Sequence, residues 1–75
     1  MKRAYKCIIN VTLFNVLLDT KLTKNITRTV VAESEEAAIE KCNDGSTPGM
    51  VVSTFYARDE QKYIEVTINS VNVNA

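Results

Sequence analysis

The feature that most constrains the fold is an alternation of side chains near the start of the chain, in the stretch AYKCIINVTLF (residues 4–14). Every second residue of this stretch is apolar or aromatic: Tyr5, Cys7, Ile9, Val11 and Leu13. Successive side chains of a β-strand point to opposite faces of the sheet, so a period of two predicts a strand with one buried face. Ile8 and Phe14 break the polar side of the pattern. We expect them to mark a patch that another chain covers.

Three later stretches are rich in β-branched and aromatic residues and are predicted as strands: 25–33, 50–57 and 62–74. Turn residues within 15–25 predict a hairpin between the first two strands. The polar segment RDEQ (58–61) has the right length for a hairpin between the last two. In the last strand the apolar parity changes after Ser70, which indicates either a β-bulge or a break into a fifth short strand.

The inward face of the second strand can be assigned in two ways. Two alternating sets of side chains are candidates: Ile26, Val30 and Ala32, or Thr27, Thr29 and Val31. We prefer the first set. This choice places Arg28 on the core side, where its guanidinium group has to reach the edge of the sheet.

A short helix is predicted after the second strand, in the stretch ESEEAAIEKC (33–42). Ser34 is a good N-cap, because its hydroxyl can accept a hydrogen bond from a free backbone N–H of the first turn. Glu35 and Glu36 follow where the helix dipole favours negative charge. Three residues recur at helical spacing and should lie on the sheet: Ala38, Ile39 and Cys42. The sequence NDG (43–45) is expected to end the helix, with Gly45 in a left-handed conformation.

These elements predict a single α+β domain over residues 1–75. Its expected architecture is a four-stranded, or five-stranded, antiparallel sheet with the elements in the order strand–strand–helix–strand–strand and the helix packed on one face. A single helix leaves the opposite face without cover, so that face is either polar or covered by another chain.

The composition argues against catalysis and against a metal or cofactor. The chain has no histidine and no CxxC pair, and none of its serines has a histidine base. Cys7 and Cys42 are expected to be reduced, buried thiols rather than a disulfide, because no export signal or membrane span is recognisable and we expect a cytoplasmic protein. Nine basic and nine acidic residues cancel, which disfavours a dedicated nucleic-acid binder.

Two groups of residues are candidates for binding a partner. The basic residues of the first hairpin form one group: Lys21, Lys24 and Arg28. Aromatic and basic residues around the second hairpin form the other group: Tyr56, Arg58, Lys62 and Tyr63. Aromatic rings beside basic groups can anchor a protein interface or stack on bases.

Two motifs of the chain resemble those of small type I-F anti-CRISPR proteins. The chain opens with MKRAY, and its strand-to-helix junction AESEEAA leads to a cysteine and a GST turn in CNDGST. The chain is also similar to phage accessory proteins in being small and without catalytic groups. The resemblance implies a stoichiometric inhibitor that binds a surface subunit of a CRISPR–Cas complex. The segment VLLDTKLTKN and a C-terminal strand poor in aromatic residues depart from the family, so no binding residue is carried over.

Three functions are therefore considered. The first is a non-enzymatic phage or mobile-element inhibitor that binds a host defence protein. The second is a small nucleic-acid or nucleotide-binding module. The third is a structural accessory subunit that forms a homodimer through the uncovered face of its sheet.

Overall fold

The computed structural model describes residues 1–43 and 47–74. They form four strands, one α-helix and one turn of 3₁₀-helix: β1 (Arg3–Asn15), β2 (Thr20–Ala32), α1 (Glu35–Asn43), β3 (Val51–Ala57), η1 (Arg58–Glu60) and β4 (Lys62–Asn74). The predicted class is confirmed: a small α+β domain with a four-stranded antiparallel sheet and one helix.

The strands do not lie side by side in the order of the chain, so the predicted order is wrong for the sheet. The sheet order is β2-β1-β4-β3, with the first and last strands in the centre. Hairpins make neighbours of β1 and β2 and of β3 and β4. The connection through α1 is long enough to lead from one edge of the sheet to the other, and β4 pairs with β1 as a result.

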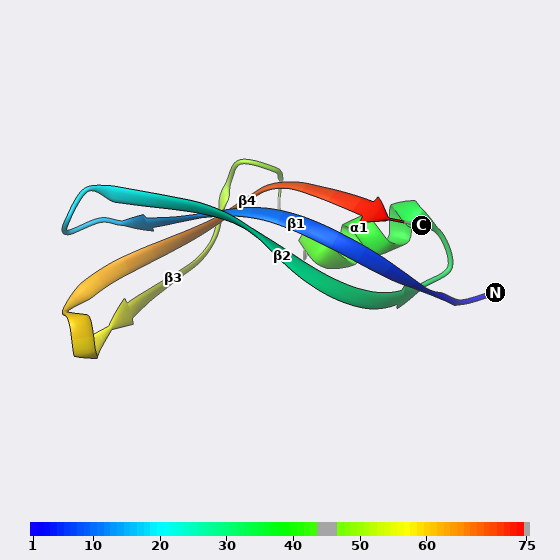
Figure 1. Cartoon of the computed structure of the whole chain (residues 1–75), viewed down its shortest axis with the longest axis horizontal. Helices are drawn as coiled ribbons and strands as arrows, with labels where there is room; N and C mark the ends of the chain where they lie inside the picture. The colour runs from blue at the N-terminus through cyan, green and yellow to red at the C-terminus, as the bar shows by residue number, and fades with distance from the viewer. Residues whose placement is uncertain (44–46, 75) are drawn as a thin grey trace.

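The helix covers only one end of one face of the sheet. Figure 1 shows α1 and both chain ends at one end of the long axis, and the tips of the two hairpins at the other. The molecule measures 45 × 19 × 18 Å. We call the face that carries α1 the helix face and the other the open face. The part of the sheet beyond α1, residues 12–24 and 53–66, is called the projecting half.

The hydrophobic core lies where α1 meets the sheet. The buried residues that form it come from β1, β2, α1 and β4: Cys7, Ile9, Val11, Val30, Ala32, Ala38, Cys42 and Ile68. In the described residues of the projecting half, the one buried side chain is polar, Asn15. The apolar alternation of β1 is therefore fully buried only over the part of the strand that α1 covers.

The start of α1 agrees with the prediction. Ser34 precedes the first helical residue, and its Oγ accepts a hydrogen bond of 3.1 Å from the backbone N–H of Ala37. Glu35 and Glu36 occupy the first turn. The predicted left-handed residue at the end of the helix, Gly45, lies outside the described residues.

The packing of α1 agrees with the prediction in part. Ala38 and Cys42 are buried against the sheet. Ile39 is only half-buried, and Ala37 packs against the core instead. The helix is thus rotated toward its alanine side, where small side chains allow the backbone of α1 to come close to the strands.

The second strand is longer than predicted. β2 begins at Thr20 instead of residue 25, and the additional residues pair with the end of β1. These residues are polar or alternate weakly because they belong to an exposed edge strand, which needs no continuous apolar face. The sequence therefore placed Lys24 in a turn, whereas it lies within β2.

The preferred inward face of β2 is confirmed. Val30 and Ala32 are buried under α1. Ile26 is on the same face but is 42% exposed, because α1 does not extend over it. Arg28, also on this face, is exposed.

The change of parity in the last strand is a β-bulge. Ser70 pairs with Asn10 and Ile68 with Val11, so Asn69 is an extra residue between the two pairs. The Asn69 side-chain amide donates a 2.9 Å hydrogen bond to Oδ1 of Asn10. β4 continues through the bulge, so the alternative of a fifth short strand does not apply to this segment.

Candidate functional site

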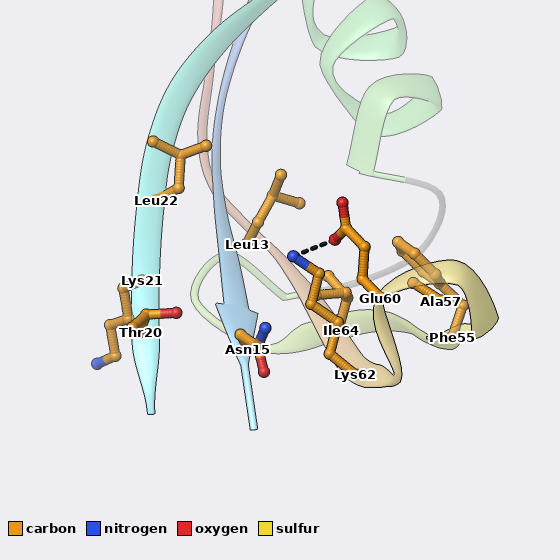
Figure 2. A pocket seen from close by; sticks show the side chains of 10 residues that line it. All are labelled: Leu13, Asn15, Thr20, Lys21, Leu22, Phe55, Ala57, Glu60, Lys62 and Ile64. Carbon is orange, nitrogen blue, oxygen red and sulfur yellow. Dashed lines mark ion pairs between the residues drawn. The ribbon is translucent and has the colours of Figure 1, made fainter. Parts of the chain in front are cut away.

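An apolar groove lies on the helix face of the projecting half (Figure 2). Its volume is about 340 Å³. Its apolar lining comes from all four strands: Leu13, Leu22, Phe55, Ala57 and Ile64. Its polar lining lies mainly toward the hairpin tips: Asn15, Thr20, Lys21, Glu60 and Lys62. A concave, mainly apolar surface with a few polar groups is the usual form of a binding site.

Strand pairing builds the floor of the groove. Directly paired residues of antiparallel strands point to the same face, so they form rows across the sheet. The first row is Leu22, Leu13, Val66 and Ser53. The second row is Thr20, Asn15, Ile64 and Phe55. The floor is therefore a continuous sheet surface whose shape follows from the register of the strands.

The apolar side chains of the groove remain in contact with solvent. Leu22 is 58% exposed and Phe55 is 49% exposed. By contrast, Val11 lies one position along the same face of β1 from Leu13 and is only 4% exposed. The difference follows from the position of α1. Val11 belongs to the core that includes Ala38 and Cys42 of α1, whereas Leu13 and Leu22 do not.

One buried side chain fixes an end of the groove. Asn15 is 6% exposed, and its Oδ1 accepts a 3.0 Å hydrogen bond from the backbone N–H of Leu18. This bond closes the turn at 16–19, in which Asp19 adopts a left-handed conformation with φ of 53°. A buried polar group needs such a partner, and here the bond also holds the β1–β2 hairpin in shape.

Two of the three charged residues that line the groove are paired with each other, and the third is Lys21. Lys62 forms an ion pair with Glu60, and both side chains reach the rim near Ile64 (Figure 2). Both are partly exposed, so the pair contributes little to stability. It does, however, leave this side of the groove without net charge.

The predicted basic group is divided between the two faces of the sheet. Lys24 and Arg28 are on the helix face and exposed. Lys21 is on the open face, where its Nζ lies 5.5 Å from the centroid of the Phe14 ring, although the residue also lines the groove. The three residues therefore do not form one cationic cluster, and a role in binding stays a prediction for each.

The predicted aromatic and basic group around the second hairpin is divided in the same way. Tyr56 and Tyr63 pair directly on the open face, with ring centroids 4.9 Å apart and ring planes at 41°. Lys62 is on the helix face and belongs to the groove. Arg58 is exposed in η1. The tyrosines are thus separated from the lysine expected beside them.

The open face is held by a ladder of polar side chains. The Asn10 amide donates a 2.9 Å hydrogen bond to Oδ1 of Asn25, and the hydroxyls of Thr12 and Thr23 are 3.2 Å apart. Asn69 joins the ladder from β4 by donating to Thr12 at 2.7 Å. These polar groups form hydrogen bonds with one another, so much of the open face is polar. A polar face was one of the two alternatives expected for the face without the helix. Ile8 and Phe14 are half-buried there, and the polar Asn10 and Thr12 lie between them along β1. Cover of these two residues by another chain stays a prediction.

The two thiols lie in the core rather than at a surface site. Cys7 and Cys42 are both free and buried, at 0% and 3% exposure. Burial raises the pKa of the Cys42 thiol, and a hydrogen bond with Cys7 adds to this effect. A thiol held in its neutral form is a poor nucleophile. In the described part of the chain no three His, Cys, Asp or Glu residues are placed to hold a metal ion.

Sequence reasoning missed most of the groove. Leu13 belongs to the predicted apolar face of the first strand, and that face was expected to be buried. Leu22 lies in a stretch where no strand was predicted. The only available signal was the length of the strands relative to the short helix, which implies that part of the inward face remains uncovered.

Comparisons with protein-family models, with curated proteins and with solved structures find no match to this chain. The resemblance to anti-CRISPR proteins thus stays a prediction from the sequence motifs. None of the helices in the described ranges has the length and apolar character needed to cross a membrane.

Proposed function

We propose that this protein acts by binding another protein, with the groove as its docking surface, and that it catalyses no reaction. The observation that carries the proposal is the exposed apolar lining of the groove, in particular Leu22 and Phe55. Apolar side chains gathered on one concave surface favour association, because a partner removes them from water.

The chemistry of the described residues supports binding over catalysis. The chain has no histidine, and its two thiols are buried in the core. The ionisable groups nearest the groove include Lys62 and Glu60, which are paired with each other. General acid–base catalysis needs a titratable group poised in a cleft, and this groove offers a paired surface lysine and carboxylate instead.

The test compares two variants of adjacent residues on opposite faces of β3. Phe55 lines the groove and is 49% exposed, whereas Tyr56 is on the open face and is 45% exposed. Tagged wild type, Phe55→Asp and Tyr56→Asp are used to capture proteins from cells that naturally carry the gene. A stoichiometric partner that wild type and Tyr56→Asp retain, and Phe55→Asp loses, supports the proposal. Capture that is equal for all three chains refutes the groove as the docking surface.

The narrower hypothesis is an inhibitor of a host defence protein of the anti-CRISPR kind. It is supported by the sequence motifs and is compatible with a docking surface on an exposed half-sheet. Expression in bacteria with an active type I-F CRISPR–Cas system should restore plaque formation by a targeted phage. Normal immunity at full expression of the protein removes this hypothesis and leaves the binding role intact.

Nucleic-acid binding has less support. Lys62 lies on the opposite face from Tyr56 and Tyr63, so these two rings lack the predicted lysine beside them. Electrostatic binding to a nucleic acid weakens steeply between about 50 mM and 200 mM salt. Fluorescence anisotropy with labelled single-stranded DNA and RNA at these two salt concentrations tests the alternative, and we expect no salt-dependent binding.

A further inference from the structure

The projecting half gives this chain more surface than a compact domain of its size. The accessible surface is 5418 Å², whereas a compact protein of 8.4 kDa exposes about 4,600 Å². The radius of gyration is 14.0 Å, compared with about 11 Å for a compact chain of this length. The excess surface, about 800 Å², equals what one partner buries in a protein interface of standard size.

From this excess and from the position of the groove, we infer that the partner of the groove is a second copy of this chain. The inference rests on the proposed function and names the protein that docks there. The exposed apolar side chains of the projecting half favour association in any cell that makes this chain. A second copy of the chain is always available there as a partner. Two β-sheets that pack face to face commonly form a hydrophobic core between them.

The position of α1 selects one arrangement of the two copies. A two-fold axis along the strands would bring the two helices against each other and hold the grooves apart. Because α1 lies at one end of the long axis (Figure 1), a two-fold axis across the strands places the two helices at opposite ends. The two projecting halves then stack between them.

The charges around the groove are compatible with this stack. The Lys62–Glu60 pair adds no net charge to the surface that is buried. Lys24 pairs with Val11, which belongs to the core with α1, so Lys24 lies at the α1 end of the projecting half. A two-fold axis across the middle of the projecting half places the two Lys24 side chains at opposite ends of the stack. Like charges of the two copies are therefore not directly opposite each other there.

Sedimentation equilibrium of the purified full chain tests the inference. We expect wild type to have twice the 8.4 kDa mass of the chain at about 10 µM, since interfaces of this size reach micromolar affinity or better. Phe55→Asp should weaken the dimer about 100-fold or more, because it buries an unpaired carboxylate. Tyr56→Asp is the matched control and should stay dimeric. Both residues are about half exposed in the single chain, so neither change removes a core contact, and circular dichroism checks the fold of each variant.

Each outcome decides between the alternatives. A wild type that is monomeric up to about 1 mM, a concentration far above micromolar affinity, overturns the second-copy inference. A dimer that both variants weaken equally, or that neither weakens, overturns the groove as its interface. A monomeric wild type that captures another protein through Phe55 refutes the inference but leaves the proposed function standing. A monomer without groove-dependent capture refutes both.

Discussion

Ile9→Ala and Ile26→Ala form a matched pair that tests whether α1 covers only one half of the sheet. The two isoleucines are direct cross-strand partners on the helix face, yet Ile9 is 6% exposed and Ile26 is 42% exposed. The change to alanine removes three carbon groups worth about 0.8 kcal/mol each when buried, which gives about 2.3 kcal/mol at Ile9 and about 1.4 kcal/mol at Ile26. A closed cavity at Ile9 raises its cost to about 3–4 kcal/mol, whereas the space at Ile26 opens to solvent.

The assay is urea denaturation followed by far-UV circular dichroism, with both changes made in the Phe55→Asp background so that self-association does not cover Ile26. A chain of 75 residues has a free energy of unfolding of about 4–11 kcal/mol. We therefore expect Ile9→Ala to lose a large share of its stability and Ile26→Ala to keep most of it, at unchanged m-values. Equal losses from the two changes would refute the division of the sheet into a covered and an uncovered half.

Three further changes test local features. Ser34→Ala removes the N-cap bond of α1 and should lower the free energy of unfolding by about 1 kcal/mol in urea denaturation; an unchanged midpoint contradicts the cap. Asn15→Ala removes the acceptor of the Leu18 N–H, and hydrogen exchange of that amide, followed by NMR, should become about three- to tenfold faster. Burial raises the pKa of the Cys42 thiol, so the folded state keeps its proton at a pH where the unfolded state has lost it. The contribution of the Cys42 thiol to the free energy of unfolding is therefore complete below about pH 8.5, and it decreases as the pH rises further. Thermal unfolding of wild type and Cys42→Ala across this range measures the effect, and an equal decline in both refutes it.

The parts of the fold that depend on local pattern could be predicted from the sequence. The alternation of β1 defined its inward face, and Ser34 marked the start of α1. The parity change after Ser70 predicted a bulge or a break of the strand, and the structure has the bulge, at Asn69. In each case neighbouring residues determine the structure through strand periodicity, capping or register.

The parts that depend on distant segments could not be predicted. No local pattern states that β4 pairs with β1, because the sheet order depends on where the connection through α1 leads. The beginning of β2 was missed because an exposed edge strand does not need the apolar alternation that identifies a buried one. The division of the basic group follows from the same omission. Once the strand is known to include residue 21, its period of two places Lys21 on the opposite face from Lys24 and Arg28.

The groove itself follows from a mismatch of lengths. β1, β2 and β4 each have 13 residues, and α1 has nine. At about 3.3 Å per residue such strands extend over about 43 Å, whereas a helix of this length extends over about 13 Å. Even if it lay along the strands, α1 would therefore cover about a third of them. The projecting half therefore lies outside the core that α1 completes, and Leu22 and Phe55 stay exposed on its helix face. Its open face carries the polar Thr12–Thr23 pair and also the half-exposed Tyr56–Tyr63 pair. The concave, mainly apolar lining of the groove, rather than exposure alone, therefore distinguishes the helix face as the proposed docking surface.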